Sequence, residues 1–237
     1  MRLLPTLLPF LLASSLLAAA PVDELLTRLG TCTDTSPVKV RVSHSFSRTT
    51  GEGKESRTEE RLVKLTAQAS PESGLVLSWD SDQLRSPGAN AEKNSLSAIG
   101  PQSVFDFLNA APVFSKRLNG AVLLEDKSDT FQGSPTRLLV VKLDPKLDAQ
   151  SKKYIKQIEA LAKIWLDPEG YPLAAETSVS LKGRAYLVIT FDSAEKETYR
   201  FARVGGRLLV TQHDKTGGGS GAGEKATIQE QTKLELL

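Results

Sequence analysis

The stretch that decides the fold is KIWLDPEGYPLAAETSVSLKG, residues 163–183. Two largely apolar runs flank Asp167, Pro168, Glu169 and Gly170, and this combination is typical of a tight turn. Proline presets its own φ for a turn, and glycine accepts the positive φ that many turns require. The stretch therefore predicts two β-strands joined by a tight turn.

The chain beyond this hairpin continues as a meander of strands with short connections. Alternation of apolar and polar residues predicts strands at residues 173–181, 184–192, 197–204, 207–214 and 225–236. Turn residues mark connections at Lys182-Gly183, Ser193-Ala194 and Gly205-Gly206, and TGGGSGAGE, residues 216–224, predicts a flexible hairpin loop. RAYLVITF, residues 184–191, is apolar on both faces, so we expect a strand covered on both sides.

The chain before the hairpin shows the same period of two. In VKVRVSHSFSR, residues 38–48, the valines and Phe46 fall on one face and polar residues on the other. Further strands are expected at residues 62–67, 75–79, 121–125 and 137–143. About eleven strands connected in order favour a mainly β fold, in which one highly curved antiparallel sheet forms an unclosed barrel.

Two or three short helices are expected to cover this sheet as a lid. Helical spacing of apolar residues predicts one at residues 22–29 and one at residues 102–109, between two prolines. A third is expected at residues 149–160, followed by a strand. A single helix that runs on through Trp165 is the alternative for this third segment.

The first twenty residues are typical of a secretory signal peptide. Arg2 gives a positive start, residues 3–17 an apolar core, and Ala18 to Ala20 a cleavage site of small residues. The apolar run is shorter than the roughly 20 residues of a spanning helix, so a retained anchor is the less favoured alternative. We expect residues 21–237 to form one exported domain, periplasmic or secreted.

Cys32 is the only cysteine, so no internal disulfide can form in the oxidising space that export implies. A lipid-carrying cysteine is disfavoured, because the preceding residues include a charge and Thr31 stands where a small residue is needed. We therefore expect a half-buried thiol.

No set of residues at motif spacing predicts catalysis. His44 and His213 each lie inside an alternating strand without a nucleophile or a second ligand at motif spacing, so we expect structural histidines. Asp80 and Asp82 lack the glycine and distal glutamate of a calcium loop, and Glu224 interrupts the Gly-Lys pair of a phosphate-binding loop. We predict a non-enzymatic protein with no metal, no cofactor and, given its mixed charges, no nucleic-acid partner.

A curved sheet of this size is expected to leave an apolar cavity beneath its lid. Phe105 and Leu108 share one face of the predicted helix at residues 102–109 and are expected to face the sheet. The residues predicted to contact a hydrophobic ligand are Trp79, Phe105, Leu108, Trp165, Leu187, Ile189 and Phe191.

This pattern resembles the LolA/LolB-like superfamily of periplasmic lipoprotein carriers and outer-membrane lipoprotein acceptors. The features that carry the resemblance are the signal, the helix before VKVRVSHSFSR, the helical insertions, and the hairpin WLDPEGYPLAAE, residues 165–176, with the meander after it. The chain lacks the proline-phenylalanine helix start of the carriers and the lipobox cysteine of the acceptors. No individual functional residue is therefore transferred from the family.

The resemblance implies a half-barrel domain over residues 21–237 that binds lipid or lipoprotein acyl chains in outer-membrane lipoprotein sorting. It also implies contact with another envelope protein, and we expect a monomer. The alternative is a structural or regulatory envelope module with a self-filled barrel that acts through protein contacts. A hydrolase ranks last, because no acid, base and nucleophile can be named.

Overall fold

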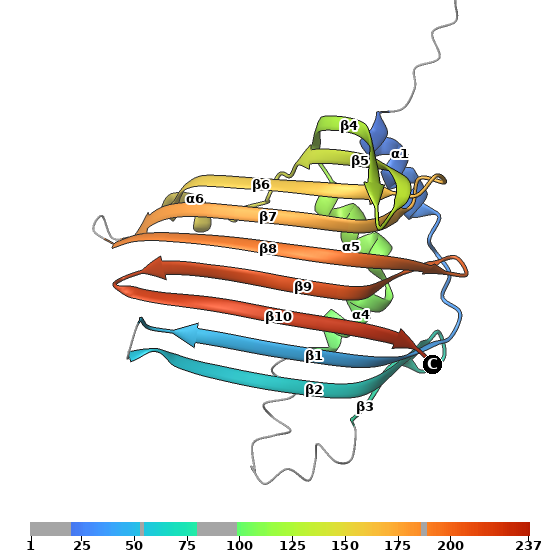
Figure 1. Ribbon diagram of the computed structural model, residues 1–237, viewed down its shortest axis with the longest axis horizontal. Coiled ribbons are helices and arrows are strands. Elements are labelled where there is room, and N and C mark those ends of the chain that lie inside the picture. The colour runs from blue at the N-terminus through green and yellow to red at the C-terminus, as the bar shows by residue number, and fades with distance from the viewer. Residues whose placement is uncertain (1–19, 53–54, 80–98, 186–188) are drawn as a thin grey trace, which may run out of the picture.

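The computed structural model describes residues 20–52, 55–79, 99–185 and 189–237. In these residues ten antiparallel strands form one sheet, in the spatial order β3-β2-β1-β10-β9-β8-β7-β6-β5-β4 (Figure 1). The strands are β1 Val38–Thr50, β2 Arg57–Ser70, β3 Gly74–Trp79, β4 Val122–Phe131, β5 Ser134–Lys142, β6 Ile155–Leu166, β7 Pro172–Ala185, β8 Ile189–Val204, β9 Arg207–Gly221 and β10 Glu224–Leu236. The sheet is curved and unclosed, with β3 and β4 at its edges, which confirms the predicted fold class.

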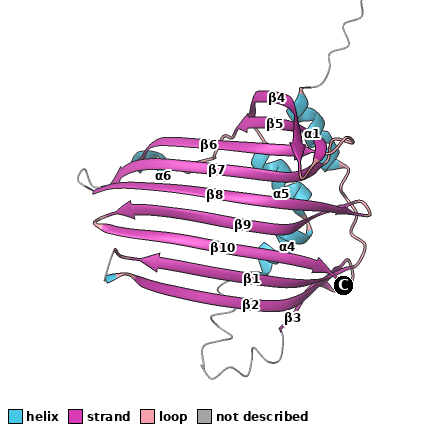
Figure 2. Cartoon of the chain, viewed as in Figure 1, coloured by secondary structure: helices cyan, strands magenta, loops and turns pink. Residues whose placement is uncertain are grey.

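Four helices accompany the sheet in the described residues: α1 Pro21–Gly30, α4 Pro101–Leu108, α5 Ala110–Leu118 and α6 Ser151–Tyr154. Figure 2 shows α1, α4 and α5 over the same end of the strands. We call the face of the sheet that these three helices cover the inner face. None of the helices in the described part of the chain is long and apolar enough to cross a membrane.

The hairpin at residues 163–183 is confirmed as the connection between β6 and β7. The amide of Asp167 donates to the carbonyl of Tyr171 at 2.8 Å, and Gly170 has a φ of 88°. Asp167 Oδ1 accepts hydrogen bonds from the amides of Glu169 and Tyr171, each at 2.9 Å. The aspartate side chain thus satisfies the turn backbone, while glycine supplies the positive φ.

The helix predicted at residues 149–160 is wrong, as is the alternative that extends it through Trp165. Only α6, Ser151–Tyr154, is helical, and β6 begins at Ile155. β6 pairs with β5 on one side and β7 on the other. Its buried residues Ala160, Ala162, Ile164 and Leu166 alternate along the strand. Tertiary pairing on both sides outweighs the helical spacing of the segment.

Two predicted turns lie inside longer strands. Lys182-Gly183 belongs to β7 and Ser193-Ala194 to β8. The strand predicted at residues 184–192 is also wrong, because β7 ends at Ala185 and β8 begins at Ile189, with these two residues paired across the connection. Residues 186–188 lie outside the described part of the chain. β7 and β8 thus form a hairpin whose last described pair is Ala185 with Ile189.

The predicted flexible loop at residues 216–224 is also mostly strand. β9 continues through Gly221, and only Ala222 and Gly223 form the turn, with φ values of 53° and 83°. Two consecutive residues with positive φ are typical of a tight hairpin turn whose twist matches that of the flanking strands. The glycines at 217–219 are therefore part of the sheet.

A second lid helix, α5, directly follows α4, and the sequence does not predict it. α4 begins at Pro101 as expected, but Pro112 lies in the first turn of α5 and does not end a helix. Proline is tolerated there, because the first amides of a helix have no partner within the helix. α5 packs Phe114 and Leu118 into a core shared with Leu25 and Leu29 of α1. α4 packs Leu108 against the valines of β1.

Candidate functional site

A cavity of about 260 Å³ lies between α4 and α5 and the inner face of β1, β8, β9 and β10. Its apolar wall contains Ile99, Phe107, Ala110, Val113, Phe114, Phe201 and Val210. Its polar wall contains His44, Ser103, Asp106, Arg117, Glu197, Tyr199, His213, Lys215, Glu230 and Thr232. One side of the cavity thus suits an apolar group and the other a polar group.

The strand register brings four of the polar side chains into one row across the inner face. His44 of β1 lies opposite Thr232 of β10, which lies opposite His213 of β9, which lies opposite Tyr199 of β8. His44 Nδ1 and Thr232 Oγ1 are 2.9 Å apart, and the rings of His213 and Tyr199 stack with centroids 4.6 Å apart. Directly opposite residues share a face, so all four meet the cavity.

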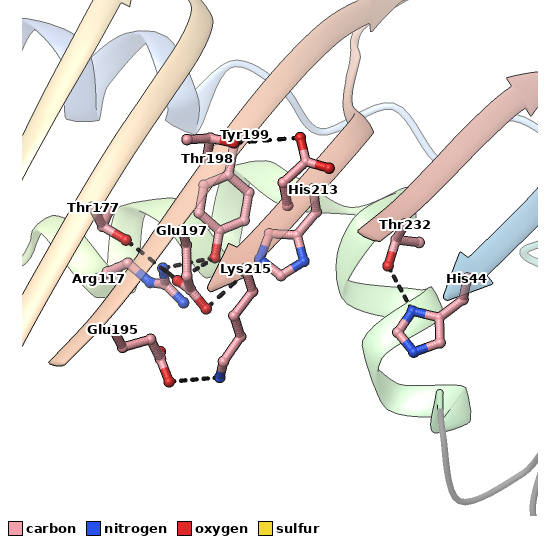
Figure 3. Close-up of polar contacts among 11 residues, drawn as sticks. His44, Arg117, Thr177, Glu195, Glu197, Thr198, Tyr199, His213, Lys215 and Thr232 are labelled. Carbon is pink, nitrogen blue, oxygen red and sulfur yellow. Dashed lines mark hydrogen bonds and ion pairs between the residues drawn. The ribbon is translucent and has the colours of Figure 1, made fainter. Parts of the chain in front are cut away.

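A buried network centres on the carboxylate of Glu197 (Figure 3). Its Oε2 accepts hydrogen bonds from Arg117 Nη1, from Tyr199 Oη at 2.6 Å and from Thr177 Oγ1 at 3.3 Å. Arg117 Nη1 also donates to Tyr199 Oη at 2.8 Å. The second oxygen, Oε1, lies 3.6 Å from His213 Nε2. Arg117 from α5 thus connects the lid to β8.

The network shifts the pKa values of its members in opposite directions. Burial alone would raise the pKa of Glu197. The neighbouring His213, the charge of Arg117 and the hydrogen bonds from Tyr199 and Arg117 outweigh burial and hold that pKa well below its usual range. Burial raises the pKa of Tyr199, and the adjacent Glu197 carboxylate raises it further against the opposing charge of Arg117. Glu197 is therefore a carboxylate and Tyr199 a neutral phenol near neutral pH.

A second charged row lies beside the first. Glu230 of β10 lies opposite Lys215 of β9, which lies opposite Glu197 of β8. Lys215 forms its ion pair with Glu195 at 2.7 Å (Figure 3). Burial lowers the pKa of Lys215, but its contacts with Glu195 and the charges of Glu197 and Glu230 outweigh this and raise it.

The structure does not place the described ligand-contact residues predicted from sequence in this cavity. Phe105 is 44% exposed, and Leu108 is fully buried in the core beside β1. Trp79 packs on the same core from the edge strand β3. The neighbour of Phe105, Phe107, is the lid residue that lines the cavity.

Trp165 and Phe191 also lie elsewhere. Trp165 alternates with the buried residues of β6 and therefore faces away from the inner face, where its Nε1 donates to Asp129 Oδ2 at 2.8 Å. Phe191 lines a separate hollow of about 440 Å³ along the glycines of β9. Leu187 and the side chain of Ile189 lie outside the described residues.

The two histidines are buried, with exposed fractions of 3% for His44 and 7% for His213. His44 is a hydrogen-bonded strand histidine, as predicted, because its Nδ1 pairs with Thr232 Oγ1. No group of three or more metal-ligating side chains occurs in the described residues, and Asp80 and Asp82 lie outside them. Cys32 is half-buried as predicted, and burial raises the pKa of its thiol against the charge of Arg203.

Sequence reasoning did not single out Arg117, Glu197 or Tyr199 as site residues. Each of these residues is unremarkable in its own segment, because the network forms only when α5, β7, β8 and β9 meet. The sequence does show that Glu197 and Tyr199 are two residues apart in a predicted strand, which places both side chains on one face of β8.

Comparison with known proteins identifies no relative by sequence. No family model matches the chain, and no curated protein matches it. Among solved structures, the chain is similar to the crystal structure of MucB in complex with MucA(peri), with 9% sequence identity and a TM-score of 0.21. That alignment covers 90% of this chain and 94% of the other. A TM-score of 0.21 does not show a shared fold, so the comparisons show no family for this chain.

Proposed function

We propose that this chain is an exported, non-enzymatic binding protein of the cell envelope that holds an apolar group between its lid and its sheet. The observation that carries the proposal is the cavity of about 260 Å³ between α4, α5 and the inner face. Phe107, Phe114 and Phe201 present aromatic surface to it. Burial of apolar ligand surface against these rings contributes about 25 cal/mol per Å².

The size of the cavity limits the ligand. Pockets that bind small molecules span roughly 300–1,000 Å³, and this cavity lies just below that range. It fits one short apolar segment, such as the end of a single acyl chain of a lipid or lipoprotein. Several whole acyl chains, as the family resemblance implies for a carrier, need more space than this cavity provides.

The protonation states of the buried network support binding without catalysis. A general acid or base is most effective when its pKa lies near the operating pH. The pKa of Glu197 is lowered and that of Tyr199 is raised, so each moves away from neutrality. The hydrogen bonds from Arg117 and Tyr199 to Glu197 instead fix the position of the α5 lid over β8.

The second candidate function is an envelope module that acts through protein contacts. The observation that favours it is the part of the inner face beside the lid cavity, which carries charges of both signs. Arg61, Glu230 and Lys215 line one hollow there together with Phe46. A mixed, charged surface suits a polypeptide partner better than hydrocarbon chains.

Binding of a fluorescent fatty acid to two matched lid variants tests the proposal. Phe107 lines the cavity and Phe105, two residues away on α4, is 44% exposed. We expect Phe107→Ala to weaken probe binding about tenfold, which corresponds to about 1.4 kcal/mol, and Phe105→Ala to leave it unchanged. If the unmodified protein takes up no apolar probe, the binding role is wrong and the protein-contact module becomes the better assignment.

A further inference from the structure

The polar wall of the cavity contains more acidic than basic side chains. Asp106, Glu197 and Glu230 line it together with the basic residues Arg117 and Lys215. Each basic side chain already has a carboxylate partner, because Arg117 pairs with Glu197 and Lys215 with Glu195.

Glu230 takes part in neither of these two ion pairs. It is half-buried on β10, and no described residue forms an ion pair with it within 4.0 Å. Its nearest base along the row, Lys215, is engaged by Glu195 at 2.7 Å. Asp106, in contrast, accepts a hydrogen bond from Gln102 Nε2 at 2.7 Å. The cavity thus offers a carboxylate with capacity for a cation.

Two further acceptor positions lie on β9, one strand away from Glu230, and on β8, two strands away. The hydrogen bonds to Glu197 from Arg117, Tyr199 and Thr177 converge on Oε2, so Oε1 has only His213 Nε2 near it, at 3.6 Å. His213 is 93% buried, since its exposed fraction is 7%, and Nε2 has no hydrogen-bond partner among the described residues. A buried polar atom without a partner costs free energy that a bound donor would recover.

The surroundings of His213 suit a cation attached to an apolar chain. The ring of Tyr199 stacks on His213, and the ring of Phe107 lies 5.4 Å from it. Aromatic faces attract cations, and the attraction grows when water is excluded. The apolar wall continues from Phe107 to Phe114, so an alkyl chain can follow the head group.

We propose that the cavity binds an alkylammonium ligand, a short apolar chain that ends in a protonated primary amine. The chain lies against Phe107 and Phe114, and the ammonium group lies between Glu230, Glu197 Oε1 and His213 Nε2. An ammonium group has three N–H donors and no acceptor, which matches this set of acceptors. A carboxylate or phosphate group would face the same acids and be repelled. This inference rests on the proposed function, because it names the head group of the ligand for the same cavity.

Calorimetric titration of the full-length protein with three probes of equal chain length tests the head group. Hexylammonium, hexanol and hexanoate each have six carbons and differ in the head group, which is cationic, neutral and anionic in turn. We expect hexylammonium to bind about tenfold more tightly than hexanol, and hexanoate to bind most weakly. Hexanol or hexanoate binding as tightly as hexylammonium would overturn the alkylammonium inference and leave the proposed function intact. If none of the three binds, both are wrong.

Two glutamine variants on β10 locate the ammonium group. We expect Glu230→Gln to lower the affinity for hexylammonium about tenfold and leave that for hexanol unchanged. Glu235→Gln is the matched control, because Glu235 lies on the same strand at an outward-facing position, paired with exposed Arg41. An unchanged hexylammonium affinity in Glu230→Gln contradicts the assigned position. The comparison of the three probes on unmodified protein does not depend on either variant.

A lysine side chain and a free amine present the same chemistry, and a fourth probe distinguishes them. The blocked tripeptide Ala-Lys-Ala carries one such side chain, and its Nε-acetylated form has lost the charge. Tighter binding of the tripeptide than of hexylammonium identifies a polypeptide as the source, and the reverse order identifies a free amine. Equal binding of the tripeptide and its acetylated form contradicts the inference.

Discussion

The phenyl ring of Phe191 on β8 lies directly over Gly183, its cross-strand neighbour on β7. A Cβ atom added to Gly183 would lie 2.1 Å from Cζ of Phe191, so the ring occupies the space that a side chain would take. Glycine weakens a strand because it has no side chain to pack, and an aromatic ring on the facing strand compensates. The two residues therefore function as one packing unit at the end of the β7–β8 hairpin.

A double-mutant cycle tests this unit. We expect Gly183→Ala to destabilise the protein by about 1–3 kcal/mol, because the new methyl group displaces the ring. In a Phe191→Ala background the same change should be neutral or stabilising by up to about 1 kcal/mol. Urea unfolding of the four proteins gives the coupling energy. Equal effects of Gly183→Ala in both backgrounds would show that the ring does not rest on the glycine.

The network at Glu197 predicts that two conservative changes both destabilise the protein. Tyr199→Phe removes one hydroxyl and leaves Arg117 and Glu197 paired, so it should cost about 1.5–3 kcal/mol. Glu197→Gln leaves Arg117 without its carboxylate. Loss of one member of a fully buried pair costs about 3–5 kcal/mol, and because Arg117 is 35% exposed we expect about 2–3 kcal/mol. Denaturant midpoints measure the loss of stability in both variants. The control is Arg41→Gln, which breaks the exposed ion pair with Glu235 and should leave the free energy of unfolding almost unchanged.

The lowered pKa of Glu197 predicts how stability depends on pH. Burial opposes the shift, but the contacts with His213, Arg117 and Tyr199 outweigh it. A carboxyl with a lowered folded-state pKa contributes stability that is complete above its unfolded-state pKa of about 4.3 and is lost as the pH falls through the folded-state pKa. The difference in unfolding free energy between the unmodified protein and Glu197→Gln should therefore be smaller at about pH 3 than at about pH 5.5. A difference that grows on acidification would reverse the assigned sign.

The glycines of β9 predict a sharp sensitivity to a single methyl group. A Cβ on Gly219 would lie 2.7 Å from the carbonyl oxygen of Asp192 on β8, and backbone cannot move aside easily. We expect Gly219→Ala to cost about 1–3 kcal/mol. Gly30→Ala at the end of α1 is the control, since its Cβ would meet nothing within 4 Å, and it should be neutral or slightly stabilising. Thermal unfolding of both variants makes the comparison.

The proposed export predicts where the mature chain begins. Cleavage at the small residues before Pro21 would leave α1 as the start of the folded domain. We expect the mature N-terminus between Ala18 and Val22, as measured by peptide mapping of protein from the native cell envelope. Retention of Met1 in the mature protein would contradict the proposed export and the periplasmic localisation.

The parts of the fold that the sequence predicts well are those fixed by local chemistry. Asp167 and Gly170 define the β6–β7 hairpin through contacts within five residues, so the turn is visible in the sequence. Gly217 and Gly219 led to the wrong prediction of a loop, because glycine is rare in strands, yet both lie in β9. Their place in β9 depends on the close approach of β8, which no local pattern reveals.

The candidate site could not be predicted because its geometry depends on an irregularity in the sheet. β8 and β9 pair Val204 with Arg207 at their turn, and an unbroken ladder from there would place Tyr199 opposite Gln212. The register shifts between Arg200 and Phe201, and Tyr199 instead lies opposite His213. A bulge of one residue exchanges the faces of a strand. Without it, His213 would point away from the cavity.

The pairing of β1 with β10 has a consequence for the order in which this protein folds. Val40 lies opposite Leu236, so β1, which pairs with β2 on one side, finds its partner on the other side only in β10. As the chain emerges, the strands β4 to β9 can pair in succession, while the β1–β2–β3 group can join them only through β10. Contacts at such separation in sequence form slowly, because the closure of the intervening chain costs entropy before the contact stabilises it. The inner face is therefore completed only after β10 has emerged.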